Sequence, residues 1–161
     1  MIRKLEKSDC GPLMDLLEAV RNFTAAELAI AAELIDIVLN RQEQEDYYAF
    51  IDEQESRVAG FVILGPVPAT TGSWHMYWIA VHPDFQGKGV AQDLDRAAES
   101  FVGSKAGYWI LAETSGQPSY QRTRAFYRKQ GYRVLAQIPD YYKPADDLII
   151  FGKRLQGGEP V

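Results

Sequence analysis

The glycine-rich segment VHPDFQGKGVAQDL, at residues 81–94, has the residue types of an anion-binding site. Its pattern predicts a strand that ends in a turn, with an amphipathic helix directly after it. A helix N-terminus presents unpaired backbone N–H groups and about half a positive charge. Gly87 and Gly89 let the backbone approach an anion closely, and Lys88 adds a mobile positive charge. We therefore expect a phosphate or pyrophosphate site, the alternative being a plain tight turn before a capped helix.

The spacing within this segment does not fit two common nucleotide-binding patterns. A P-loop requires G-x-x-x-x-G-K-[ST], which the segment lacks. A dinucleotide fingerprint requires G-x-G-x-x-G/A, but the sixth position counted from Gly87 is Gln92. The pattern that remains is Q-x-x-G-x-A, formed by Gln86, Gly89 and Ala91. These failures disfavour a nucleotide-phosphate-binding protein of another fold.

The elements that would position this turn follow from the spacing of apolar residues and turn formers. Two early helices are expected, one capped by Ser8 or Asp9 and one that begins at the capping box of Thr24 and Glu27. The other expected elements are strands over 2–5, 46–53, 57–68, 74–81, 107–114, 132–138 and 147–155, a helix over 90–103 and a short helix around 125–127 that ends at Gly131. The segment 138–147 is expected to be a loop. This order predicts a mixed sheet covered by helices, of class α/β or α+β, as one domain over 1–155 with a frayed tail at 156–161.

Composition excludes several other classes of protein. The chain has 161 residues, 47% apolar and 24% charged, which is ordinary for a soluble globular domain. It has no apolar run of roughly 20 residues, and its first ten residues, MIRKLEKSDC, do not resemble a signal peptide. A single cysteine, Cys10, excludes an intramolecular disulfide and a cysteine-based zinc cluster. The net charge of −5 lowers the expectation of nucleic-acid binding. We expect a cytoplasmic protein with no membrane, metal or nucleic-acid partner.

Two segments resemble the signatures of a known enzyme family. The segment IAVHPDFQGKGVAQDL, at residues 79–94, resembles the acyl-CoA-binding signature of the GNAT superfamily of N-acetyltransferases, whose core is Q/R-x-x-G-x-G/A. The segment TRAFYRKQGYRV, at residues 123–134, resembles the second signature, with Tyr127 and Gly131 at the places of its tyrosine and glycine. The order of the expected elements is also like that of the family, so the resemblance covers nearly the whole chain.

The resemblance implies a GNAT-like fold, a mixed and mostly antiparallel sheet of about seven strands flanked by four helices, with splayed central strands. It also implies acetyl-CoA as co-substrate. The pantetheine arm would lie in the gap between the splayed strands and pair with the backbone of Ile79, Ala80 and Val81, much as an added strand does. The pyrophosphate would lie on the backbone N–H groups of Gly87, Lys88, Gly89, Val90 and Ala91, with Gln92 in reach and the side chains of Gln86 and Lys88 on phosphate oxygens.

Three side chains stand where the family has catalytic groups. Tyr127 takes the position of the tyrosine that protonates the CoA thiolate. His75 lies six residues before Val81, an offset at which several branches of the family have a general base. Glu113 lies near the place at which other members have a glutamate base. Each also has a structural alternative: a packed aromatic, a hydrogen-bonded strand histidine, and a carboxylate that holds the next loop.

The acceptor is expected to be an amine, either a small molecule or one that is amino-acid-like. Residues i and i+2 of a strand share a face, so Tyr77 should lie beside His75. Other candidate acceptor contacts are Tyr141, Tyr142, Asp146 and Asp147. A protein N-terminal acetyltransferase and a non-catalytic CoA-binding or sensing module stay open as alternatives. Because homodimers are common in the family, a homodimer is also expected.

The sequence departs from the family at one cofactor contact. Many members carry an asparagine near the start of the second-signature helix, but no asparagine lies between residues 114 and 131. Ser115, Ser119 or Gln121 could take its place. The basic run of Arg122, Arg124, Arg128 and Lys129 is expected to be a solvated helix face, or else a contact for the 3′-phosphate of CoA.

Overall fold

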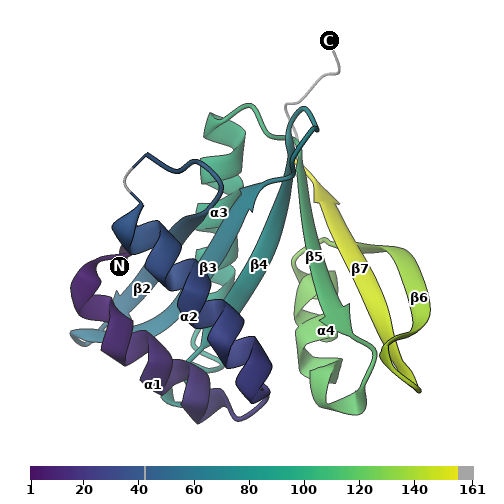
Figure 1. Ribbon diagram of the computed structural model, residues 1–161, viewed down its shortest axis with the longest axis horizontal. Coiled ribbons are helices and arrows are strands. Elements are labelled where there is room, and N and C mark those ends of the chain that lie inside the picture. The colour runs from purple at the N-terminus through teal and green to yellow at the C-terminus, as the bar shows by residue number, and fades with distance from the viewer. Residues whose placement is uncertain (42, 156–161) are drawn as a thin grey trace.

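A seven-stranded mixed sheet forms the centre of the protein (Figure 1). The computed structural model describes residues 1–41 and 43–155, so the tail expected at 156–161 lies outside the described residues. The strands run in the order β1-β2-β3-β4-β5-β7-β6, and only β4 and β5 pair in parallel. Their bounds are β1 Ile2–Lys4, β2 Tyr48–Gln54, β3 Arg57–Pro66, β4 Ser73–Val81, β5 Trp109–Ser115, β6 Arg133–Lys143 and β7 Asp146–Arg154. This confirms the predicted fold class.

Four α-helices cover the sheet on its two faces. Their bounds are α1 Cys10–Val20, α2 Ala25–Asn40, α3 Val90–Ser104 and α4 Gln121–Lys129, with short 3-10 turns at Lys7–Asp9, Pro83–Phe85 and Pro118–Tyr120. We call the face under α1 and α2 the front face and the face under α3 and α4 the rear face (Figure 1). The front core is built from α1, α2 and the middle strands, and includes Leu13, Leu16, Ile35, Phe61 and Ile63. The rear core includes Met76, Leu94, Val102, Ile110, Tyr127 and Phe151.

The predicted helix signals appear at two of the helix ends. At the start of α2, Glu27 N donates to Thr24 Oγ1 at 3.2 Å and Thr24 N donates to Glu27 Oε2 at 2.7 Å, so the capping box is confirmed. At the end of α4, Gly131 has φ +88, and the Tyr132 N–H donates to the Tyr127 carbonyl at 3.0 Å. These are the features of a left-handed helix cap, which places Tyr127 in the last turn of α4.

The two halves of the sheet separate between β4 and β5. The strands pair only where Ser73–Met76 lies beside Trp109–Ala112. Beyond those residues β4 continues to Val81 and β5 continues to Ser115, but the two strands no longer pair with each other, and their ribbons diverge (Figure 1). This confirms the predicted splay of the central strands.

A β-bulge lies in β4 at the point of separation. Ile63 of β3 pairs with Trp78, while its neighbour Leu64 pairs with Met76, so Tyr77 is an extra residue in β4. A bulge bends a strand, increases its twist and re-aims a side chain. The bulge therefore lets β4 turn away from β5 and places Tyr77 at the edge of the gap.

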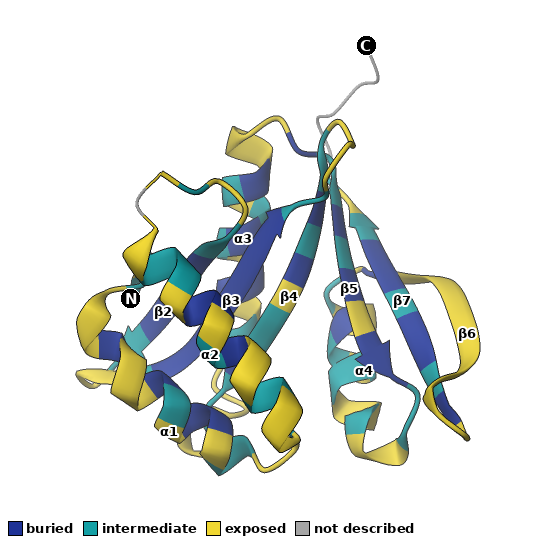
Figure 2. Cartoon of the chain, in the orientation of Figure 1, coloured by how far each residue is buried: buried dark blue, intermediate teal, exposed yellow. Residues whose placement is uncertain are grey.

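The predicted loop at 138–147 is wrong. Strand β6 continues to Lys143 and β7 starts at Asp146, so only Pro144 and Ala145 connect them. Strand β6 is an edge strand, where a proline such as Pro139 removes no required hydrogen bond. Its pairing with β7 is irregular between Ile138 and Lys143. All of β6 is exposed (Figure 2).

Candidate active site

The turn before α3 presents backbone N–H groups that no acceptor in residues 1–41 and 43–155 uses. Gly87 has φ +76 and Gly89 has φ +89, both in the left-handed region. Gly89 is the N-cap of α3, and no side chain caps the helix. Within the described residues, no hydrogen bond is recorded from the backbone N–H groups of residues 87–91. A phosphate can accept several such bonds at a helix N-terminus, so the turn fits the predicted pyrophosphate site.

Side chains around this turn add positive charge and hold its shape. The Lys88 Nζ lies 5.0 Å from the centre of the Phe85 ring, which is buried. Arg57, at the start of β3, lies 5.0 Å from the same ring and pairs with Asp84 at 2.9 Å. Sequence reasoning missed Arg57, because nothing local links β3 to this turn. Gln86 Nε2 donates to the Val81 carbonyl at 3.4 Å, so it must move to contact a phosphate as predicted.

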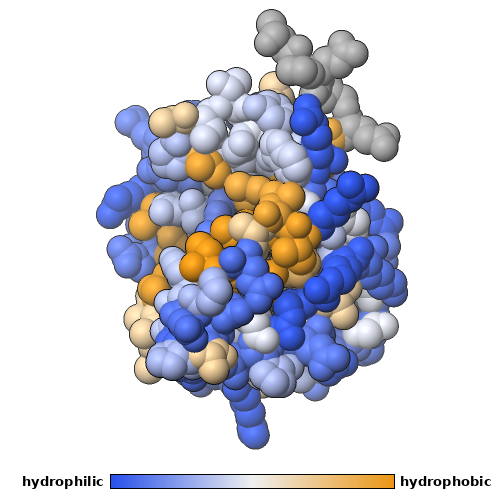
Figure 3. All heavy atoms as spheres, turned by 90° about the vertical axis from the view of Figure 1, so that its right-hand side faces the viewer, coloured by the Kyte–Doolittle hydropathy of each residue, from blue (hydrophilic) through white to orange (hydrophobic). Residues whose placement is uncertain are grey.

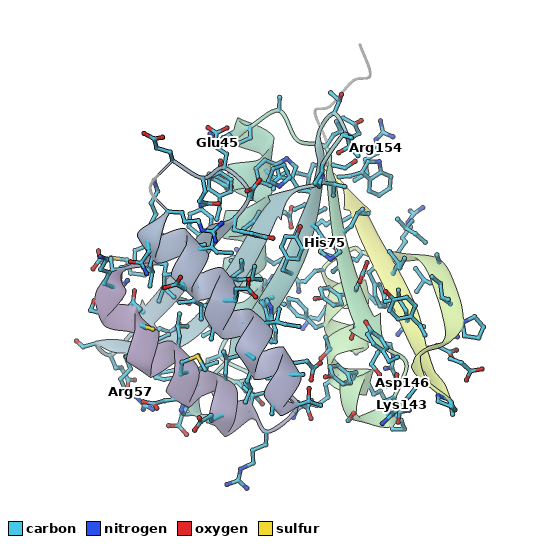
Figure 4. The ribbon with its side chains drawn as sticks, viewed as in Figure 1. Glu45, Arg57, His75, Lys143, Asp146 and Arg154 are labelled. Carbon is cyan, nitrogen blue, oxygen red and sulfur yellow. The ribbon has the colours of Figure 1, made fainter. Side chains whose placement is uncertain are left out.

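His75 lies on the front face of β4, just above the separation of the strands (Figure 4). Its ring stacks on that of Tyr77, with centroids 4.7 Å apart and an angle of 20° between the rings. The predicted juxtaposition of these two side chains is therefore confirmed. Burial lowers the pKa of His75, and the negative charge of Glu113 opposes that change. The imidazole is thus uncharged at neutral pH and can accept a proton.

Glu113 lies across the gap from Tyr77. Leu111 pairs with His75, and Glu113 is two residues further along β5, so it shares the front face. The Glu113 side chain is exposed. Burial raises the pKa of Tyr77 and of Tyr142, and the charge of Glu113 adds to both rises. The structure therefore brings together four of the predicted site residues, which come from β4, β5 and β6.

The β6–β7 hairpin borders this group. Burial and the charge of Glu113 raise the pKa of Tyr142 to about 12, while Tyr141 packs edge-on against it at 5.0 Å. Asp146, labelled in Figure 4, is buried and accepts a hydrogen bond from Ser115 Oγ. Asp147 accepts from Gln137 Nε2 at 2.6 Å and from Asp140 N at 3.1 Å. Both aspartates thus stabilise the hairpin, and their contact with the amine substrate stays a prediction.

Tyr127 lies on the rear side of the separated strands. It is 4% exposed, and its ring centre is 5.3 Å from those of Tyr132 and Phe151. Burial and the charge of Asp95 raise the pKa of Tyr127. The phenol therefore keeps its proton at every physiological pH. Sequence reasoning missed Asp95, a buried carboxylate of α3, because its partners lie on other elements.

The start of α4 uses its polar groups to join elements. Arg124 Nη1 donates to the carbonyls of Ser115 and Gln117 at 2.7 and 2.8 Å, so the expected solvated face is wrong for Arg124. Tyr120 donates its hydroxyl proton to the Asn22 carbonyl at 3.2 Å. Of the substitutes expected for the family asparagine, Ser115 already donates to Asp146.

Residues 1–41 and 43–155 lack two further features. No group of three or more His, Cys, Asp or Glu side chains there is placed to hold a metal ion. No helix in these ranges is both long and apolar enough to span a membrane.

Comparison with known proteins gives consistent matches. The sequence matches the acetyltransferase (GNAT) domain family over residues 43–134, more than half of the chain. An uncharacterised N-acetyltransferase of Methanocaldococcus jannaschii is 29% identical over 106 residues, which span 65% of this chain and 65% of that protein. The crystal structure of a candidate GNAT-family acetyltransferase from Desulfovibrio desulfuricans has a TM-score of 0.92 and 31% identity, and the match covers 96% of this chain and 98% of the other.

More distant structures share the fold alone. An aminoglycoside 6′-N-acetyltransferase complexed with coenzyme A has a TM-score of 0.78 at 17% identity, over 100% of this chain and 99% of the other. The ribosomal-protein-S18-alanine N-acetyltransferase from Escherichia coli has a TM-score of 0.78 at 21% identity, over 100% and 97%. Their names give different acceptors, so the shared fold does not identify an acceptor.

Proposed function

This chain belongs to the GNAT acetyltransferase family, and from that premise we propose that it transfers an acetyl group from acetyl-CoA directly to a small amine. One observation carries the proposal. The gap where β4 leaves β5 has His75 and Glu113 on its front side and Tyr127 on its rear side. A candidate proton acceptor and a candidate proton donor therefore flank the same gap.

The backbone around this gap supports acetyl-CoA as the donor. Acetyl-CoA would supply an activated acetyl group as its thioester. Ile79, Ala80 and Val81 have no strand partner on the β5 side, so their backbone groups on that side can pair with an extended arm. The N–H groups of residues 87–91, with Lys88 and Arg57 nearby, would hold the pyrophosphate.

The front side of the gap would remove the proton of the amine. An amine is protonated near neutral pH and must lose a proton to attack a carbonyl. The uncharged imidazole of His75 accepts that proton, directly or through water, and the charge of Glu113 stabilises the resulting imidazolium. If Glu113 is itself the base, His75 and Tyr77 would instead position the amine.

The rear side of the gap would protonate the departing sulfur. Tyr127 keeps its phenolic proton before the reaction because its pKa is raised. As the C–S bond breaks, negative charge develops on the CoA sulfur, and a proton from Tyr127 makes that sulfur a better leaving group. No step of this scheme uses an acyl-enzyme, since the one thiol, Cys10, is on the exposed surface of α1.

The surroundings of the acceptor side suit an amine. The charged groups that act on Tyr77 and Tyr142 are carboxylates: Asp46, Glu113 and Asp146. Aromatic rings line the same region, since Tyr47 packs edge-on against Tyr77 at 5.3 Å. Carboxylates and aromatic faces both attract a protonated amine.

We also propose a homodimer, for which the molecule has a suitable contact surface. Figure 3 shows an apolar patch on the side of the molecule that carries β6 and β7. On β6 the exposed apolar side chains include Val134, Leu135 and Ile138, 42–49% exposed. Sedimentation of the wild type and of Ile138→Lys tests this proposal, because a dimer that uses the patch should dissociate in the variant.

Transfer can be tested with matched amines. Pentylamine, its derivatives that end in a second amine or in a carboxylate, and short peptides with a free N-terminus should be offered with acetyl-CoA, and thiol release followed. We expect release that requires an amine and that falls in Tyr127→Phe. The derivative with the second amine should react best because the acceptor side is anionic. Binding of CoA without release for any amine would favour a sensing module, and release only with peptides would favour a protein N-terminal acetyltransferase.

A further inference from the structure

Behind Tyr127 the protein buries a carboxylate that the proposed chemistry does not use. Asp95 of α3 is 0% exposed. Its Oδ1 accepts a hydrogen bond from the Tyr132 hydroxyl at 2.8 Å. Its Oδ2 has no hydrogen-bond partner among the described residues, and the Lys153 Nζ is 3.8 Å from it. Lys153 forms an ion pair with Oδ2 at that distance, but a buried oxygen that accepts no hydrogen bond is rare and requires an explanation.

The cap of α4 couples Asp95 to Tyr127. The Tyr132 N–H donates to the Tyr127 carbonyl at 3.0 Å, and the Gly131 N–H donates to the Arg128 carbonyl at 3.1 Å. This pair of bonds fixes Tyr132 against Tyr127, whose ring centres are 5.3 Å apart. Asp95 therefore holds the hydroxyl of a side chain that packs directly on the candidate acid. Its charge also acts on Tyr127 itself.

Four titratable groups face Asp95 from the elements around it. Glu99 lies one turn further along α3, Lys153 lies on β7 and donates a hydrogen bond to Glu99, and Tyr127 and Tyr132 lie in and after α4. Burial and, to a smaller extent, Glu99 raise the pKa of Asp95, while Tyr132 and Lys153 lower it, and the result is a pKa of about 7. Asp95 can therefore exist with or without its proton near neutral pH.

We propose that Asp95 is a positioning residue for Tyr127, and that it assists acid catalysis when uncharged and hinders it when charged. In the proton transfer, the O–H bond of Tyr127 breaks and an S–H bond forms, while the electron pair stays on the tyrosine oxygen. A phenolate next to a buried carboxylate is disfavoured by like-charge repulsion. Loss of the charge on Asp95 removes that repulsion. The inference rests on the proposed function, because it concerns the acid of that reaction.

The Asp95→Asn variant tests the inference, since asparagine has nearly the same shape and cannot ionise. The kcat of the variant divided by that of the wild type should be near one at low pH. It should rise as the wild-type Asp95 loses its proton, by up to about tenfold, because charged Asp95 makes Tyr127 a weaker acid. Dividing the two values cancels the ionisation of the amine and of His75. A purely structural role would change the ratio by the same factor at every pH, and that result would overturn the inference.

Two matched variants should move the pH at which kcat falls in opposite directions. Tyr132→Phe removes the hydrogen bond that stabilises charged Asp95, so the fall of kcat should move to higher pH. Glu99→Gln removes a neighbouring negative charge, so the fall should move to lower pH. Either variant keeps the inference testable if Asp95→Asn fails to fold. A transition that stays in place in both would overturn it.

A measurement without substrate separates this inference from the proposed function. Carboxyl-carbon NMR of protein labelled at aspartate should show Asp95 titrating at a pH of about 7, and at a higher pH in Tyr132→Phe. Loss of the resonance in Asp95→Asn assigns it. If Asp95 titrates as expected but no amine is acetylated, the proposed function falls and the inference falls with it. If amines are acetylated but Asp95 stays charged throughout, the inference alone is overturned.

Discussion

The front and rear sides of the gap between β4 and β5 hold their titratable groups in different ways. On the front, Tyr77 is 37% exposed and Glu113 is exposed, so water reaches the group around His75 (Figure 2). On the rear, Tyr127 is 4% exposed and Asp95 is 0% exposed. A proton from an amine can therefore leave to solvent on the front, whereas a proton on the rear is kept in a dry core.

This difference shows how one physical effect gives two opposite roles. Burial disfavours the charged form of any group, so it lowers the pKa of His75 and raises that of Tyr127. The first becomes a free base and the second keeps its proton. A carboxylate then adjusts each one: Glu113 acts on His75, and Asp95 acts on Tyr127.

The largest effect is expected from the rear side. Tyr127→Phe removes the proton donor and keeps the packed ring, so kcat should fall by about 10²–10⁴-fold while the affinity for acetyl-CoA stays within a few fold. Steady-state kinetics and CoA titration measure the two quantities. Tyr48→Phe is the matched control, since Tyr48 packs on the same rear core away from the gap. An unchanged kcat in Tyr127→Phe, with chemistry limiting the rate, would make Tyr127 only a packed aromatic.

On the front side, His75→Ala should lower kcat/KM by roughly 10²-fold, since general base catalysis is lost. In the wild type kcat/KM should rise with pH through a pKa below the usual value of His, because burial lowers the pKa of His75. This rise should be absent from the His75→Ala profile.

Glu113→Gln separates the two candidate bases. If His75 is the base, the rise should move to lower pH, because the charge of Glu113 raises the pKa of His75. If the rise disappears instead, Glu113 is the base on the front side of the gap.

A substitution in the turn before α3 should abolish the binding of acetyl-CoA without changing the titratable groups on either side of the gap. Acetyl-CoA should stabilise the wild type by about 2.7 kcal/mol at a hundredfold excess over Kd. Gly89→Glu should abolish this shift, because a carboxylate would face the pyrophosphate and the φ of +89 disfavours any side chain. Gly103→Glu, near the other end of α3 where a side chain has open space, is the control. Thermal shifts that are equal in all three proteins would move the cofactor site elsewhere.

The smallest effect is expected at the start of α2, where the Thr24 side chain is exposed. Thr24→Ala removes half of the capping box of α2 and should lower the free energy of unfolding by about 1 kcal/mol. Because α2 covers only the front core, kcat should not change. Chemical denaturation measures the stability, and a large loss of activity in this variant would show that α2 contributes to the site.

Much of the candidate site follows from local sequence. The turn at Gly87 and Gly89, the cap at Gly131 and the capping box of Thr24 and Glu27 involve groups only a few residues apart. The residue types near each position therefore predict them. The pairing of His75 with Tyr77 was also predictable, from strand alternation, although the bulge at Tyr77 was not.

Contacts that tertiary structure decided join residues far apart in the chain. Ser115 and Asp146 are 31 positions apart, Tyr132 and Asp95 are 37 apart, and Lys153 and Glu99 are 54 apart. No local pattern names such partners, because a buried polar side chain is satisfied by whichever element packs against it. For the same reason the segment expected to be a loop at 138–147 forms part of a hairpin, because its backbone groups can pair with those of β7.

The sequence by itself thus determined most of the elements, the capping box of α2, the cap of α4 and the glycine-rich turn, since these depend on backbone geometry and hydrogen bonds within a few residues. Only the tertiary structure decided which titratable groups are buried and which charges face them. Burial and charge at His75 and Tyr127 arise from several elements at once. Protonation states in the candidate site are therefore a property of packing, which the order of residues along one strand or helix does not contain.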